Sequence, residues 1–252
     1  MVSILDRVRR TNTPAPVDPE PESFEEMTLQ EHLEELRTRL MYAAGSVIIG
    51  FIIGLVVAKP LLRVMVRMSG LGSLVAISPT ESFTVFMKVA LYVGIGLSMP
   101  VIIYQIVRFL APGLTRRERQ YVFRAIPFVT GMFALGVLFA FFIVIPRALR
   151  FLHGFGGSVF TSEFRANEVI SFYMTLILWV GIVFELPLVM YILAKIHVVT
   201  TRMLSSMRKY AIIIIMIAAA IITPTPDPFN MFMVAAPMYV LYELGILLTR
   251  FA

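Results

Sequence analysis

Six long apolar segments constrain this chain more than any other feature of its sequence. Connections with charge, proline or glycine separate the segments, which lie at about residues 40–58, 84–107, 125–145, 169–193, 210–223 and 230–249. An apolar stretch of roughly 20 residues forms a helix long enough to cross a bilayer. Because 58% of the 252 residues are hydrophobic and only 15% are charged, we predict an all-α integral membrane protein with six transmembrane helices.

The first 27 residues differ in composition from the rest. They include "TNTPAPVDPEPESFEE", which is rich in proline and acids, so we predict a disordered tail over residues 1–27. No apolar segment follows Arg9 and Arg10 before Leu40, so this arginine pair is not read as an export signal of the chain itself. Residues 28–250 are predicted to form a single six-helix domain.

Basic residues are divided unequally between the two sets of connections. The regions that would share a side with the termini hold fifteen: Arg7, Arg9, Arg10, Arg37, Arg39, Arg108, Arg116, Arg117, Arg119, Arg124, Lys195, Arg202, Arg208, Lys209 and Arg250. The opposite regions hold six: Lys59, Arg63, Arg67, Arg147, Arg150 and Arg165. The positive-inside rule therefore predicts cytoplasmic termini, and it accounts for the net charge of +6 without nucleic acid.

Length and proline single out several spans. The segment 210–223 would cover about 21 Å of a hydrocarbon core of about 30 Å, and Pro237 interrupts the sixth segment. We therefore predict short fifth and sixth helices, which either thin the nearby lipid or are sheltered by neighbouring helices. Pro100 and Pro187 predict bends in the second and fourth spans, which either form a concave wall or serve packing alone.

Charged side chains within the spans are rare and informative. Glu185 lies about 12 Å below the cytoplasmic surface by helical rise, so it needs a partner or a proton. Lys88 either reaches the outer surface or meets Glu81, seven residues earlier on the same helical face. The chain has no cysteine, its histidines are isolated in sequence, and no catalytic or phosphate-binding motif occurs. We therefore expect no enzyme, metal site or cofactor.

Acidic residues gather where the first span begins. Thr28 and Glu31 fit a capping box that predicts a helix from residue 29. Glu31 and Glu35 would share a face of this helix, and Glu118 lies among arginines in the next cytoplasmic connection. Such separated acids either receive a dibasic ligand through guanidinium pairs or merely neutralise nearby arginines.

Several segments together resemble the TatC family, the polytopic subunit of the twin-arginine protein translocase. They are "EHLEELRTRL", "SPTESFTVFMKVAL", "SMPVIIYQIVRFLAPGLTRRER", "FELP" and "TPTPDPFNMFMVAAPMYVLYELGILL", and the resemblance covers about residues 28–250. It implies a cupped-hand arrangement of six helices in the cytoplasmic membrane of a prokaryote. It also implies recognition of twin-arginine signal peptides on folded cargo, assembly with the single-span proteins TatA and TatB, self-association in a receptor complex, and transport driven by the proton motive force.

The resemblance also assigns roles to individual residues. The positions that match the signal-binding surface are Glu35, Glu118, Arg37, Phe109 and Pro112. Glu185 matches an intramembrane glutamate that meets polar positions of partner or signal helices. Pro60, at the start of the first external loop, and Asp227, in the last external turn, match an external cap, whereas Met231 stands where many members carry glutamine.

Other classes of function remain as alternatives. An ion- or proton-coupled small-molecule transporter would use Glu185 as proton carrier and Pro100 and Pro187 as hinges. No inverted repeat supports this alternative, since spans one to three differ from spans four to six in length, charge and proline placement. A membrane scaffold would tolerate substitution of the acids near the first span, and an intramembrane protease lacks a paired nucleophile and base.

Overall fold

The computed structural model describes residues 29–71, 74–154, 163–223 and 227–251, and these residues are mostly helical, as predicted. The predicted tail and its capping residue Thr28 lie outside them. In chain order the helices are α2 (Leu29–Ser69), α3 (Glu81–Leu110), the 3₁₀ turn η1 (Ala111–Gly113), α4 (Arg116–Phe139), the π-helical turn η2 (Ala140–Val144), α5 (Ile145–Gly154), α6 (Ala166–Val183), α7 (Leu186–Lys195), α8 (Thr201–Ser206), α9 (Arg208–Ile222), α10 (Pro228–Leu248) and the 3₁₀ turn η3 (Thr249–Phe251).

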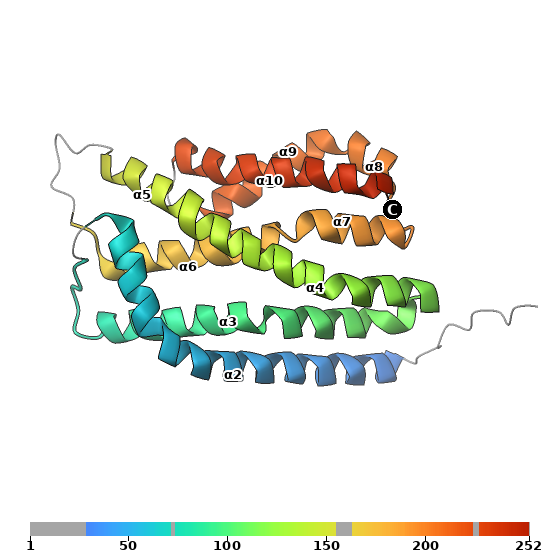
Figure 1. Cartoon of the computed structure of the whole chain (residues 1–252), viewed down its shortest axis with the longest axis horizontal. Helices are drawn as coiled ribbons and strands as arrows, with labels where there is room; N and C mark the ends of the chain where they lie inside the picture. Colours follow the sequence, from blue (N-terminus) through green and yellow to red (C-terminus); the bar gives the residue numbers. More distant parts are fainter. Residues whose placement is uncertain (1–28, 72–73, 155–162, 224–226, 252) are drawn as a thin grey trace, which may run out of the picture.

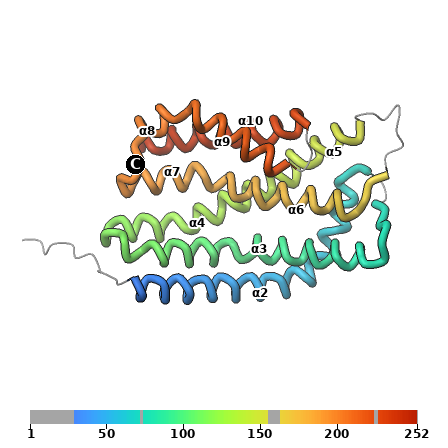
Figure 2. The backbone as a smooth tube through the Cα atoms, turned by 180° about the vertical axis from the view of Figure 1, so that it is seen from behind, coloured from blue at the N-terminus to red at the C-terminus, as the bar shows by residue number. Residues whose placement is uncertain are grey.

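The long helices form one bundle. Figure 1 shows α2 at one edge against α3, α4 crossing in front, and α8 to α10 at the other edge. Seen from behind, Figure 2 shows the same order, with α6 and α7 in the middle. The start of α2 and the end of the chain lie at the same end of the bundle (Figure 1), which we call the termini end.

Five helical stretches of the described residues are long and apolar enough to cross a membrane: Leu29–Ser69, Glu81–Gly113, Arg116–Gly154, Ala166–Lys195 and Pro228–Phe251. The predicted span 210–223 corresponds to α9, whose 15 residues extend about 22 Å. The chain is therefore a multi-pass membrane protein, and the sixth crossing stays a prediction. Because α10 has 21 residues, the expectation of a short sixth helix is wrong, and of the two helices predicted to be short only α9 is.

Small residues bring α2 and α3 into backbone contact. A Cβ atom added at Gly54 would overlap the carbonyl oxygen of Ala90, and one added at Gly94 would lie 2.6 Å from the backbone nitrogen of Phe51. The hydroxyl of Ser98 donates to the carbonyl of Ser46 at 2.7 Å, which adds a polar link between the helices. Close approach at small residues is how helices associate where lipid removes the hydrophobic driving force.

Prolines act differently in each helix. Pro100 lies inside α3, which stays continuous. The predicted fourth span is instead broken into α6 and α7 just before Pro187, because proline has no N–H to continue the ladder. The π-helical turn η2 ends just before Pro146, and its wider ladder makes room for that ring.

The larger of two buried clusters draws on α2, α3, α5, α6, α9 and α10, and the smaller one joins α3 to α4. In the larger cluster, Tyr173 of α6 is fully buried and donates a hydrogen bond to the carbonyl of Met65 in α2 at 3.2 Å. Val144 and Ile145, where η2 joins α5, are also buried in this cluster. The end of α2 is thus tied to α6, whereas its first part packs on α3.

Candidate functional site

Glu35 lies on the face of α2 that is turned toward the protein. Its side chain is only 14% exposed, and its Oε1 accepts from Arg39 Nη2 at 3.0 Å. Its other oxygen, Oε2, is buried and accepts no hydrogen bond from the described residues. A buried carboxylate oxygen without a donor is costly, so this position is suited to receive a donor from a ligand.

Aromatic contacts line the same part of the α2–α3 pair. The His32 ring stacks on Phe109 of α3 with centroids 4.4 Å apart and planes inclined by 24°. One turn earlier in α3, Gln105 has a buried Oε1 that accepts no hydrogen bond from the described residues. Together, His32, Glu35, Gln105 and Phe109 form what we call the rim site, at the termini end.

Arg37 does not join the rim site. It is exposed, and two residues along a helix turn a side chain by about 200°. The basic residue that the structure places on Glu35 is Arg39 instead. Spacing alone could have found this pair, because residues four apart share a helical face.

Glu118 caps the start of α4. Its Oε2 accepts from the backbone N–H of Thr115 at 2.8 Å and lies 2.9 Å from the Thr115 hydroxyl. The backbone N–H of Glu118 in turn donates to that hydroxyl at 3.4 Å, which completes a capping box. The pattern Thr115-x-x-Glu118 is visible in the sequence, but Glu118 was expected either to bind a dibasic ligand or to neutralise nearby arginines, and not to cap a helix. Pro112 lies in η1, the turn that leads from α3 to this cap.

Glu185 lies at the break between α6 and α7. Its backbone carbonyl accepts from Leu188 and Val189, so the main chain starts α7. Its side-chain Oε1 is buried and accepts no hydrogen bond from the described part of the chain. No side chain of the described residues is therefore the predicted partner of this oxygen.

A polar network joins two connections at the end opposite the termini. Glu81, whose side chain is 2% exposed, pairs with Arg165 at 3.2 Å. It also accepts from the backbone N–H groups of Asn167 at 3.0 Å and Ile77 at 2.9 Å. These hydrogen bonds lower the pKa of Glu81 to about 2, the largest effect coming from the N–H of Asn167 and smaller ones from Ile77 and Ser78. Burial acts in the opposite direction and raises the pKa. Glu81 precedes the apolar segment that begins at residue 84, so it lies outside the predicted span.

Lys88 does not meet Glu81, so that expectation is wrong. Its Nζ donates to Asn167 Oδ1 at 2.8 Å and to Ser171 Oγ at 2.7 Å. Both acceptors are on α6, which the sequence could not place beside α3. The Glu81 network and Lys88 therefore fix α6 to α3.

The two residues assigned to an external cap have different positions. Pro60 lies inside α2 and not at the start of a loop, because the helix continues to Ser69. Asp227 is the N-cap of α10, where its Oδ1 accepts from the backbone N–H of Asn230 at 2.7 Å. Met231, at the position expected to be polar, packs against the main core.

A second ion pair closes the α9–α10 corner at the termini end. Arg208 of α9 holds Glu243 of α10 with two hydrogen bonds, of 2.7 and 2.9 Å. The hydroxyl of Tyr239 adds a third at 3.1 Å. The carboxylate of Glu243 is therefore satisfied within the protein.

Comparison with known proteins is consistent across sequence and structure. A family model described as Sec-independent protein translocase protein (TatC) matches residues 31–237. The Sec-independent protein translocase protein TatC of Carboxydothermus hydrogenoformans is 39% identical over 227 residues, covering 89% of this chain and 93% of the relative. That of Helicobacter pylori is 38% identical over 222 residues, covering 88% and 87%. A crystal structure of the twin-arginine translocase receptor TatC matches with a TM-score of 0.78 and 36% identity, over 88% of this chain and 99% of that one.

Proposed function

Because the chain belongs to the TatC family, and so is a core component of the Sec-independent, twin-arginine protein translocase and not an enzyme, we propose that its termini end binds the paired arginines of signal peptides. The signals are those of folded cargo proteins. Binding is the first step of export, which the proton motive force drives.

The buried, unbonded oxygen of Glu35 is the observation that carries this proposal. Arg39 occupies Oε1 and leaves Oε2 without a donor. An N–H of an incoming guanidinium can donate to this oxygen, and the planar group keeps its other donors for neighbouring acceptors, which the ammonium of a lysine does not match. The stacked rings of His32 and Phe109 offer a flat surface for the same group.

Glu118 supplies the second acidic position. Its cap uses Oε2, so Oε1 stays available for the other arginine of the signal. Four basic residues surround it in sequence, namely Arg116, Arg117, Arg119 and Arg124. Arg37, which is exposed, contacts the signal from the outer side of α2, and Pro112 holds the turn that presents Glu118.

Glu185 acts after the arginine pair has bound. The apolar segment of the signal enters a concave wall formed by α3, α4, α6 and α7, where the buried Oε1 meets a polar position of the signal or of a partner helix. Glu185→Ala is expected to leave the affinity for the signal within twofold and to lower export of a folded reporter protein. Unchanged export by this variant would remove Glu185 from the mechanism.

The partners assemble at the opposite edge of the bundle. TatA and TatB dock beside α9 and α10, where Ile213, Ile217 and Phe232 are exposed, and copies of the chain associate in a receptor complex. The excess of basic residues at the termini end supports an orientation with both termini in the cytoplasm, and the proposed location is the cytoplasmic membrane of a prokaryote. The short α9 locally thins the bilayer.

The test is binding of a labelled signal peptide to the detergent-purified protein. Replacing Arg-Arg by Lys-Lys in the peptide is expected to lower affinity at least tenfold. Glu35→Gln and Glu118→Gln are each expected to weaken binding by roughly 30-fold or more, because losing one partner of a desolvated charge pair costs about 2 kcal/mol or more.

Glu34→Gln is the matched control. Glu34 is exposed and adjacent to Glu35 on the same helix, so its loss changes the charge equally without touching the rim site. We expect its affinity to stay within twofold of the unmodified protein. Full affinity in both the Glu35 and the Glu118 variants would refute the proposed binding site.

A further inference from the structure

The last part of α2 carries basic side chains on one face. Lys59, Arg63 and Arg67 are spaced by four residues, so they follow one another along the helix. All three are exposed, and no ion pair joins them to an acid of the described residues. Contacts within the fold therefore do not account for the positive charge on this face, which suggests a ligand outside the protein.

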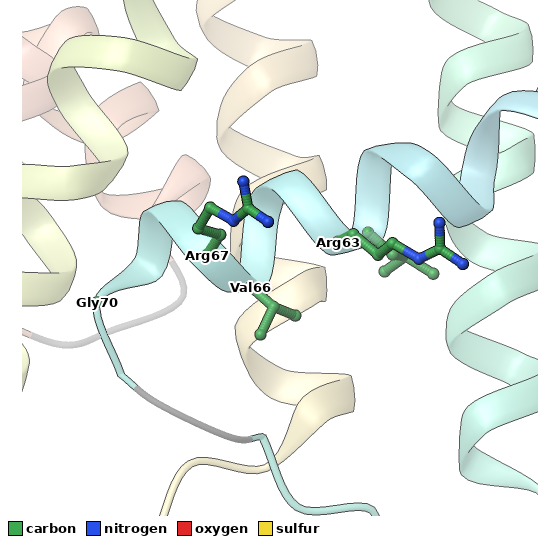
Figure 3. Close-up of a pocket in the computed structure, with 5 residues that line it drawn as sticks. Arg63, Val66, Arg67 and Gly70 are labelled. Atoms are coloured by element: carbon green, nitrogen blue, oxygen red, sulfur yellow. The ribbon is translucent and has the colours of Figure 1, made fainter.

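This part of the helix runs across the bundle instead of along it. Figure 1 shows the end of α2 leaving the direction of its first part. Pro60, inside this helix, removes a backbone hydrogen bond and so favours a bend near it. In Figure 3, Arg63 and Arg67 point their guanidinium groups to the same side of this segment. A shallow groove lies along it, lined by Leu62, Arg63, Val66, Arg67 and Gly70.

The length of α2 sets the depth of these side chains. Residues 40–58 carry no charge and extend about 28 Å, close to the thickness of the hydrocarbon core. Lys59 therefore lies where the core ends. Because the helix bends there and runs sideways, Arg63 and Arg67 stay at the depth of the lipid headgroups.

The chemistry at that depth selects the ligand. Guanidinium groups bind phosphate oxygens with two parallel hydrogen bonds, and paired cations attract anionic lipids. Val57 and Val64 are also exposed, at 38% and 45%, and they offer apolar surface to acyl chains. We propose that Arg63 and Arg67, with Lys59 beside them, bind the phosphate of an anionic phospholipid in the leaflet opposite the termini.

The experiment is native mass spectrometry of the full chain in detergent, titrated with phosphatidylglycerol or with phosphatidylcholine. We expect selective retention of phosphatidylglycerol. Each arginine near an anionic headgroup contributes roughly fivefold, so Arg63→Gln with Arg67→Gln should lower the affinity about 25-fold. Arg63→Lys with Arg67→Lys should give an intermediate loss, since the charge remains but the bidentate geometry does not.

The matched control is the double variant Arg147→Gln with Arg150→Gln, which removes two basic residues from another helix at the same end of the bundle. Both are exposed on α5, and we expect less than a twofold change. An equal loss in both double variants would mean general charge attraction and would overturn the site, as would full retention by the Arg63 and Arg67 variant.

A further arm separates a lipid from a free ion. Inorganic phosphate is expected not to displace phosphatidylglycerol; displacement at millimolar phosphate would assign the site to the ion and refute the lipid. Signal-peptide binding should be unchanged in the Arg63 and Arg67 variant, so failure of this proposal is distinguishable from failure of the rim site.

Discussion

At the scale of single residues, Glu118 combines a structural bond with a proposed contact, and substitution separates the two. Glutamine keeps the capping box but removes the charge. We therefore expect Glu118→Gln to lose signal affinity and keep its melting temperature. Glu118→Ala should also lose the bonds to Thr115 and about 1 kcal/mol of stability.

Thermal unfolding in detergent and peptide binding, measured on the same preparations, check this prediction. A lower melting temperature for the glutamine variant, equal to that of the alanine variant, would show that the charge itself stabilises α4.

The Glu81 network predicts a dependence of stability on acid. The pKa of this carboxyl is lowered from 4.5 to about 2, so its ionised form stabilises the folded state above pH 4.5. That contribution is lost as the pH falls through about 2. The difference in melting temperature between the unmodified protein and Glu81→Gln should therefore shrink between pH 5 and pH 2.

Taking the difference between the two proteins removes the titration of the other carboxylates. A difference that stays constant over this range would contradict the assignment of the lowered pKa to Glu81.

Residue spacing can indicate contacts along one helix but not contacts between helices, although neither of the two local contacts found here was predicted from the sequence. The Thr115-x-x-Glu118 box and the Glu35–Arg39 pair follow from spacing along one helix. The Glu81–Arg165 ion pair joins residues 84 positions apart, and no periodicity indicates which helices are neighbours. For the same reason neither of the two alternatives predicted for Lys88, the outer surface or Glu81, named its partners Asn167 and Ser171 on α6.

At the scale of elements, the α2–α3 contact gives the sharpest prediction. A Cβ at Gly54 would overlap backbone at Ala90, whereas one at Gly45 meets nothing within 4 Å. Gly54→Ala should lower the melting temperature, because backbone atoms on both helices must move apart. Gly45→Ala should be neutral or stabilising, since alanine favours the helix by roughly 0.5–1 kcal/mol.

Circular dichroism melts of the two alanine variants in the same detergent are the measurement. Equal melting temperatures would mean that α2 and α3 can separate without cost.

The elements themselves were predictable where hydropathy is uniform. Each of the six predicted segments is mostly helical, but their ends were misplaced wherever a helix continues beyond its apolar part. α2 continues past Pro60 to Ser69, since the ring of this exposed proline removes one backbone hydrogen bond without ending the helix. The fourth span is divided at Glu185, just before Pro187, whereas Pro100 leaves α3 continuous. The sequence predicted a bend at both prolines and could not tell which one would break its helix.

At the scale of the whole molecule, the absence of cysteine from the sequence makes the orientation testable. Arg117 and Arg150 are exposed near opposite ends of the bundle. Single variants Arg117→Cys and Arg150→Cys should react with a membrane-impermeant maleimide from opposite sides. In spheroplasts with an intact cytoplasmic membrane, we expect Arg150→Cys to be labelled. Arg117→Cys should be labelled only after the membrane is permeabilised.

The reverse pattern would place the termini outside, and labelling of both sites from one side would reject an arrangement that spans the membrane between them.

The pairing of α2 with α3 also bears on the order in which the chain is built. Nearly every contact of the first part of α2 is made with the helix that follows it, after a connection of residues 70–80. Pairing of sequence neighbours closes a short loop and is fast. The two helices can therefore enter the lipid as a hairpin while later residues are still being synthesised. Arg165, which reaches back to Glu81, then joins the finished hairpin to the second half of the nascent chain.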